Sequence, residues 1–144
     1  MKTVLLVEGV GLLRDMLRDL LESMNIQVLE ASNAAAAISI GRSHPGKIDL
    51  LLTDLEMGGK SVWESVSEIA RNRPDIRVLY MSGAISPLEW DDYKGKSAGS
   101  YFIQKPFRSE ELRELLRAIL AEVKRADQQL SQPGHFTQSP DREL

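Results

Sequence analysis

The 144-residue sequence has the length of one globular domain that can bury a sizeable core. Its net charge of -3 gives no general electrostatic reason to bind nucleic acid, and the absence of cysteine excludes disulfides, thiolate catalysis and Cys-bound zinc. No stretch approaches 18 consecutive apolar residues, and Glu8 interrupts the first apolar run too early for a signal peptide. We therefore predict a cytoplasmic protein without a membrane segment.

Short apolar runs alternate with helical patterns along the chain. Strands are predicted at residues 3–7, 26–30, 48–52, 76–81 and 101–103. Helices are predicted at residues 12–24, from an N-cap at Asn33 to before His44, at 61–72, irregularly at 85–99, and from Ser109 onward. This alternation predicts an α/β fold with a parallel sheet and helices on both faces.

The character of the sequence changes after residue 125. Residues 126–144 are rich in Gln, Ser and Pro and have no apolar periodicity. We predict a folded domain over residues 1–125 and a disordered tail or linker over residues 126–144.

Polar residues follow four of the predicted strands. Glu8 follows the first strand, Asp54 the third, Ser82 the fourth and Lys105 the fifth. Because ligands of open α/β sheets bind outside the carboxyl ends of the strands, we expect these side chains to converge there. Each has an ordinary alternative as well: Asp54 or Ser82 as a turn residue, and Lys105 as an exposed lysine.

Such a combination suits phosphoryl transfer. A carboxylate can attack phosphorus, and a divalent cation held by acids can offset the charge that develops on the phosphoryl oxygens. A hydroxyl and an ammonium can bind the remaining oxygens.

The chain resembles response-regulator receiver domains over about residues 2–123. The resemblance rests on Val4-Leu5-Leu6-Val7-Glu8, Leu51-Leu52-Thr53-Asp54-Leu55-Glu56-Met57, Tyr80-Met81-Ser82-Gly83 and Lys105-Pro106-Phe107. Residues 79–83 and 102–107 are similar to the receivers at the C-terminus of hybrid sensor histidine kinases. The resemblance implies a flavodoxin-like doubly wound sheet of five parallel strands in the order 2-1-3-4-5.

The resemblance also implies a role in two-component phosphorelay signalling. Asp54 would accept a phosphoryl group from a phosphohistidine on a histidine kinase or a histidine phosphotransfer protein, with Lys105 and Ser82 in contact with the phosphate. Ser82 and Phe102 would form the switch that changes a protein-interaction face. Enzymatic activity would be limited to self-phosphotransfer and autodephosphorylation.

The partners follow from the same resemblance and from composition. His44 lies beside a Pro-Gly pair and His135 lies in the tail, so neither is placed on a helix as a phosphodonor. We expect no direct nucleic-acid contact and no membrane contact, and the sequence is compatible with a homodimer.

The metal site departs from the family pattern at position 9. Receivers usually carry two adjacent acids after the first strand, whereas here Gly9 follows Glu8, so the implied Mg²⁺ site has a lowered affinity. Glu8 and Asp54 are the predicted ligands. We add the hypothesis that the Glu56 carboxylate replaces the acid missing at position 9. The alternative is an exposed glutamate that contributes only its backbone carbonyl.

Three other interpretations stay open. Gly58 and Val62 stand where the family usually has Pro and Gly, so the chain could be a pseudo-receiver that docks partners without phosphorylation. Gly9-Val10-Gly11, followed by Glu30, partly matches a dinucleotide-binding fingerprint, but Arg14 occupies the place of its third glycine. A small aspartyl phosphatase would use Asp54 as nucleophile and Glu56 as general acid.

Overall fold

The fold comes from a computed structural model that describes residues 1–56, 62–87, 89, 90 and 100–130. These residues form a parallel sheet in the order β2-β1-β3-β4-β5. The strands are β1 (Thr3–Val7), β2 (Gln27–Ala31), β3 (Leu50–Asp54), β4 (Arg77–Ser82) and β5 (Ser100–Gln104). The helices are α1 (Gly11–Ser23), α2 (Ala34–Ser43), α3 (Val62–Asn72) and α5 (Ser109–Leu130).

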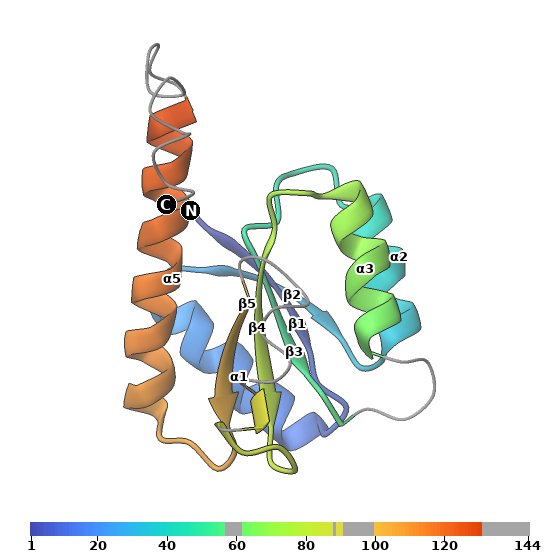
Figure 1. The fold of residues 1–144 in the computed structure, drawn as a ribbon, viewed down its shortest axis with the longest axis vertical. Helices are drawn as coiled ribbons and strands as arrows, with labels where there is room; N and C mark the ends of the chain where they lie inside the picture. Colours follow the sequence, from blue (N-terminus) through green and yellow to red (C-terminus); the bar gives the residue numbers. More distant parts are fainter. Residues whose placement is uncertain (57–61, 88, 91–99, 131–144) are drawn as a thin grey trace.

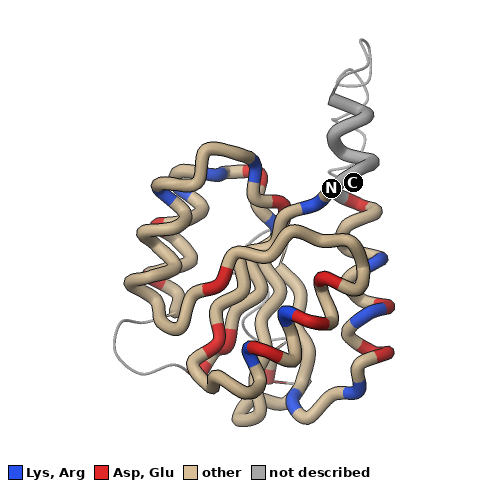
Figure 2. Tube along the Cα trace, turned by 180° about the vertical axis from the view of Figure 1, so that it is seen from behind, with Lys and Arg blue, Asp and Glu red and all other residues tan. Residues whose placement is uncertain are grey.

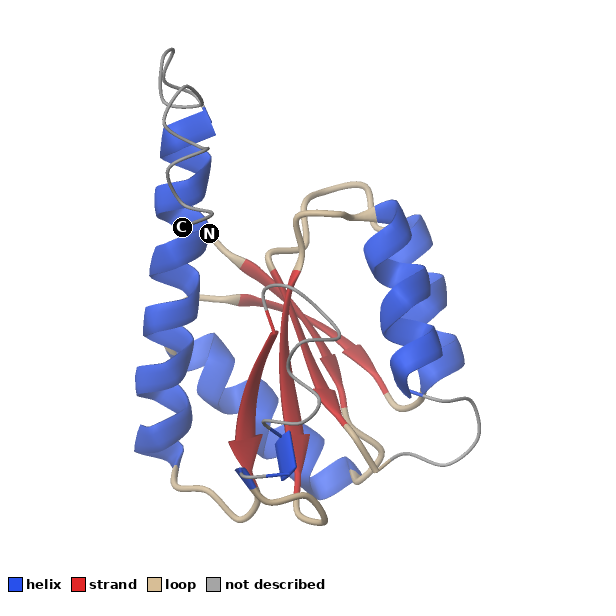
Figure 3. Ribbon diagram, in the orientation of Figure 1, coloured by secondary structure: helices blue, strands red, loops and turns tan. Residues whose placement is uncertain are grey.

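The helices cover both faces of the sheet. Helices α1 and α5 lie on one face and α2 and α3 on the other, while all five strands point toward the same edge (Figure 1; Figure 3). The predicted α/β architecture and the strand order 2-1-3-4-5 are confirmed.

Two hydrophobic clusters hold these layers together, and the alternation of side chains along a strand explains them. Val4 and Leu6 of β1 belong to the cluster that includes Leu17 of α1 and the buried residues of α5. Leu5 and Val7 belong to the cluster on the α2 and α3 side. A strand buried on both faces needs apolar residues at every position, which is the pattern that predicted the strand.

The element boundaries agree with the prediction closely but not everywhere. The predicted N-cap of α2 is confirmed, since the Ala36 N–H donates to Asn33 Oδ1 at 2.8 Å. Strand β3 begins at Leu50 rather than at Ile48 and continues to Asp54, because its ladder with β1 begins at the Val4–Leu50 pair.

The prediction for the C-terminal end needs a correction. Helix α5 continues to Leu130, so residues 126–130 are helical and the change in composition after residue 125 does not end the helix. The remainder of the predicted tail, 131–144, and residues 91–99 of the predicted irregular helix lie outside the described residues.

The surface of the two long helices carries charges of both signs. Arginines and acids both occur along α1 and along the coloured part of α5 (Figure 2). Helix α1 also exposes apolar side chains, since Leu12 is 74% and Met16 59% exposed. Met16 therefore lies outside the core, although it stands three and four residues from the helix positions Leu13 and Leu20 that pack against the core. Among the described helices, none is long and apolar enough to cross a membrane.

Candidate functional site

The carboxyl edge of the sheet brings together two acids and a lysine from three strand ends. Lys105 Nζ lies 3.2 Å from Glu8 Oε1 and 3.3 Å from Asp54 Oδ2. Glu8 follows β1, Asp54 ends β3 and Lys105 follows β5, as the parallel topology required. The predicted convergence of these three residues is therefore present in the structure.

This cluster is largely withdrawn from water. The Glu8 side chain is fully buried, that of Asp54 is 7% exposed and that of Lys105 is 21% exposed. Burial alone lowers the pKa of Lys105, but the charge of Asp54 and the hydrogen bond and charge of Glu8 outweigh it, so the pKa lies above its ordinary 10.5. Among the residues that the structure describes, two carboxylates share one ammonium here, so acids outnumber cations in this cluster.

Backbone amides hold both carboxylates in place. Asp54 Oδ1 accepts the Glu56 N–H at 2.9 Å, the local turn that an Asp at a strand end favours. Glu8 Oε2 accepts the Val10 N–H at 3.1 Å. The Leu55 N–H donates to the Met81 carbonyl of β4 at 2.8 Å, which fixes the backbone directly after Asp54. The acids are thus positioned before any ligand arrives.

Ser82 is the last residue of β4 and is fully buried. Its hydroxyl accepts the N–H groups of Ala84 and Ile85 at 3.1 and 3.0 Å, and its carbonyl accepts the Lys105 N–H at 2.8 Å. The hydroxyl donates its own hydrogen to the Glu56 carboxylate. Ser82 therefore sits beside the cluster as predicted, and its donor is already engaged.

The Glu56 side chain reaches from the end of β3 to the end of β4. It is exposed, yet its carboxylate accepts the Ser82 hydroxyl and, at 2.9 Å, the Gly83 N–H. Its predicted role as a magnesium ligand, like the role of a general acid in a phosphatase, stays a prediction.

Arg14 is a residue of the site that sequence reasoning missed. Its Nη1 donates to the Glu8 carbonyl at 2.8 Å, and its Nε lies 3.8 Å from Glu30 Oε1. The available signal was an arginine on the first turn of the helix that follows Glu8. This ion pair occupies Glu30, the acid that a dinucleotide-binding site would use for a ribose.

The two carboxylates present, Glu8 and Asp54, can supply the small number of protein ligands that a bound magnesium ion usually takes. Within the described residues, each carboxylate oxygen of Glu8 and Asp54 makes one contact with an N–H group or with Lys105, which leaves each a lone pair for a metal ion. Mg²⁺ is often held by one or two carboxylates and several waters. Gly9 contributes no side chain, and within the described residues no group of three or more His, Cys, Asp or Glu side chains could hold a metal ion.

The predicted switch residue Phe102 belongs to an aromatic cluster. Its ring stacks on Trp90 with centroids 5.2 Å apart and planes 15° apart. Trp90 also stacks on Trp63 of α3 at 6.3 Å, and Tyr80 of β4 contacts both indoles. Sequence reasoning named Phe102 but did not foresee that Trp63 and Trp90 pack with it, because the three lie far apart in the chain.

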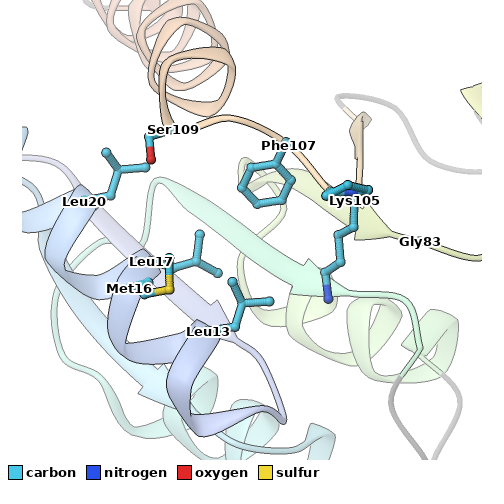
Figure 4. Close-up of a pocket in the computed structure, with 9 residues that line it drawn as sticks. Leu13, Met16, Leu17, Leu20, Gly83, Lys105, Phe107 and Ser109 are labelled. Carbon is cyan, nitrogen blue, oxygen red and sulfur yellow. The ribbon is translucent and has the colours of Figure 1, made fainter.

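An apolar groove of about 520 Å³ lies beside the cluster of charges. Leu13, Met16, Leu17 and Leu20 of α1 form one wall, and Phe107 and Ser109 lie opposite them (Figure 4). Lys105 and Gly83 line the same groove, so it reaches the carboxyl edge of the sheet.

The fold and this site define a class of protein. A doubly wound sheet with a buried acid at the end of its third strand, paired to a lysine after its fifth, is the arrangement of a signalling receiver. The family model described as "Response regulator receiver domain" matches residues 4–117, and the chain belongs to that family. It is a receiver domain of two-component signalling, and receivers interact with histidine kinases or histidine phosphotransfer proteins.

Relatives support the same family. The chain is 28% identical over 144 residues to the transcriptional regulatory protein YvrH of Bacillus subtilis, covering 96% of this chain and 59% of that protein. It is 30% identical over 129 residues to the DNA-binding transcriptional regulator NtrC of Rhizobium meliloti, covering 89% of this chain and 26% of that protein. The chain thus spans less than two thirds of either relative.

A solved structure supports the predicted likeness to hybrid-kinase receivers. The receiver domain of the hybrid histidine kinase CckA is 25% identical, with a TM-score of 0.69, and the match covers 82% of this chain and 98% of that one.

Proposed function

We propose that Asp54 accepts a phosphoryl group from a phosphohistidine of a histidine kinase or histidine phosphotransfer protein. The observation that carries this proposal is the 3.3 Å contact between Asp54 Oδ2 and Lys105 Nζ at a buried strand end. An Asp54 oxygen forms a bond to phosphorus, the bond between phosphorus and the histidine nitrogen breaks, and its electron pair stays on the imidazole. The product is an acyl phosphate on Asp54.

The neighbouring side chains would bind the phosphoryl oxygens and the metal ion. Lys105 carries the positive charge that offsets the phosphoryl oxygens, and the Ser82 hydroxyl donates to one of them. Glu8 and Asp54 would hold the Mg²⁺ that receivers generally bind, and the bound ion supplies further positive charge to the phosphoryl oxygens. Because Gly9 offers no carboxylate, we expect weak magnesium binding.

The partner docks in the apolar groove between α1 and Phe107. The groove is continuous with Lys105, so a partner seated in it brings its phosphohistidine to the carboxyl edge of the sheet. Its exposed wall residue Met16 suits the apolar face of a partner helix. Phosphorylation is read out at Ser82 and Phe102, where a shift of the ring changes the surface beside Trp90.

Labelling by a small phosphodonor tests the proposal. The protein is incubated with phosphoramidate, with and without Mg²⁺, and its intact mass is followed. We expect one phosphoryl group per chain, dependent on Mg²⁺ and absent from Asp54→Asn. Continuous turnover of a phosphomonoester instead of stoichiometric labelling would favour a phosphatase.

One observation favours a second function. Lys105 already neutralises part of the charge of both acids, and the Ser82 donor is engaged by Glu56, so the site is satisfied without phosphate or metal. A pseudo-receiver that docks partners in its unmodified state has these properties. Parent protein that stays unlabelled by phosphoramidate at saturating Mg²⁺, while still binding its kinase, would establish that function instead.

A further inference from the structure

The Glu56 carboxylate accepts two hydrogen bonds from the end of β4, although the residue itself is exposed. The residue follows β3, but its side chain reaches the end of β4, where one oxygen accepts the Gly83 N–H at 2.9 Å and the other accepts the Ser82 hydroxyl. Its own N–H donates to Asp54 Oδ1 at 2.9 Å. One residue therefore touches the phosphoacceptor with its backbone and the neighbouring donors with its carboxylate.

These donors belong to the site where phosphoryl oxygens are expected. Asp54 pairs with Met81 in the ladder of β3 and β4, so Ser82 and Gly83 follow directly on the neighbouring strand. The Lys105 N–H, bound to the Ser82 carbonyl at 2.8 Å, ties the same strand end to the lysine. A carboxylate presents two anionic oxygens, as one face of a phosphoryl group does, and can satisfy the same two donors.

We propose that the Glu56 carboxylate is an internal ligand that occupies the Ser82 and Gly83 donors and must leave them when Asp54 is phosphorylated. This inference rests on the function proposed above. Glu56 slows labelling because its carboxylate holds these two donors. Because the residue is exposed, its side chain can swing into water without disturbing the core.

Three variants separate occupancy from charge. Glu56→Ala removes both. Glu56→Asp keeps the charge but is one methylene shorter, so it loses the reach to Gly83. Glu56→Gln removes the charge but keeps an oxygen that can accept from Ser82. If occupancy restrains the site, the Asp variant behaves like the Ala variant and the Gln variant stays closer to the parent.

The first measurement is the labelling rate with phosphoramidate and Mg²⁺, followed by intact mass. We expect Glu56→Ala and Glu56→Asp to label about tenfold faster than the parent, the effect of freeing donors held by a charged acceptor. The Mg²⁺ concentration for half-maximal rate should not rise. A Glu56→Asp rate equal to the parent rate overturns the inference, and a raised Mg²⁺ requirement in Glu56→Ala assigns Glu56 to the metal instead.

The second measurement does not depend on phosphorylation. Amide hydrogen exchange, followed by NMR without phosphodonor or Mg²⁺, should accelerate at Gly83 in the Ala and Asp variants. The Leu55 amide, bound to the Met81 carbonyl, is the control that should not change. Faster exchange at Gly83 with no labelling in any variant would refute the proposed function while supporting the internal contact. If the parent and all three Glu56 variants are labelled at the same rate, the inference is refuted, whatever the exchange rate of the Gly83 amide. The proposed function of Asp54 would then still stand.

Discussion

Two aspartates at opposite ends of β3 have the same side chain and opposite surroundings. Asp49, directly before the strand, accepts the Thr3 N–H at 2.8 Å and has two lysines within reach, Lys47 at 3.7 Å and Lys2 at 4.0 Å. Asp54, the last residue of the strand, shares a single lysine with Glu8. The side chains are equally buried, with 7% exposed in each.

The difference lies in the balance of charge. At the amino end of β3 one carboxylate faces two ammonium groups that lie partly in water, and nothing more is required for stability. At the carboxyl end, within the described part of the chain, two carboxylates face one ammonium, so a further cation or a reaction that removes a carboxylate charge would balance the site. Burial alone therefore does not mark a reactive acid; the ratio of acids to cations around it does.

The largest expected effect comes from making one substitution at both ends. Asp54→Asn should abolish phosphoryl labelling, because an amide is not a nucleophile for phosphorus. Asp49→Asn should label at the parent rate, since its carbonyl oxygen still accepts the Thr3 N–H. Intact mass after phosphoramidate treatment measures both. Loss of labelling in Asp49→Asn would remove the distinction between the two ends.

Removing Lys105 should destabilise the protein, because it is the lysine that Glu8 and Asp54 share. Lys105→Met leaves the fully buried Glu8 without its ammonium, and we expect a loss of about 2–3 kcal/mol in the free energy of unfolding at pH 7, measured by urea denaturation. Lys105→Arg, which keeps the charge, is the control and should lose less.

The raised pKa of Lys105 also gives the parent a pH dependence with a defined sign. A folded-state pKa above 10.5 contributes stability that is fully present below 10.5 and is lost as the pH rises through the folded value. Urea denaturation as the pH rises above 10.5 should show this loss in the parent and not in Lys105→Met. Equal slopes in both proteins would contradict the ion pairs at the carboxyl end.

At the amino end the effect should be on stability alone. Asp49→Ala leaves the buried Thr3 N–H without its acceptor, and we expect it to cost about 1–3 kcal/mol in urea denaturation. Asp49→Asn should cost less than half of that. The labelling rate of the folded fraction should be unchanged in both variants.

The smallest effect should come from restoring an acid to the carboxyl end. A Cβ at Gly9 would meet only the Ser32 carbonyl oxygen at 3.7 Å, an ordinary contact, so Gly9→Asp should fold normally. The added carboxylate should tighten Mg²⁺ binding about tenfold, measured by titration calorimetry. Gly9→Asn adds similar bulk without charge and serves as the matched control. Equal affinities in the two variants would remove Gly9 as the cause of weak binding.

The convergence of the site was predictable because it depends on topology. Alternating strand and helix patterns predicted a parallel sheet, and a parallel sheet brings its carboxyl ends to one edge, so Glu8, Asp54, Ser82 and Lys105 could be named before any coordinates. Asn33 was recognised as a cap because its partner, the Ala36 N–H, is local in sequence.

What could not be predicted depends on side-chain geometry between distant residues. The Glu56 contact with Ser82 joins positions 26 apart, and the Lys105 contact with Glu8 joins positions 97 apart. Met16 fits the apolar period of α1, but it is exposed and lines the groove instead of joining the core. Composition changes after residue 125, whereas α5 continues to Leu130, so the change in composition does not coincide with a helix end.

The near-parallel rings of Trp63, Trp90 and Phe102 give the molecule an intrinsic optical probe. Stacked aromatic pairs contribute about 0.5–1.5 kcal/mol beyond their buried area, so Phe102 cannot turn away without a cost and without changing the surroundings of the Trp90 indole. Tryptophan fluorescence should therefore change when the Phe102 side chain moves, so no attached dye is needed. Replacing Trp63 or Trp90 would remove part of the fluorescence signal and would also weaken the packing of the Phe102 ring.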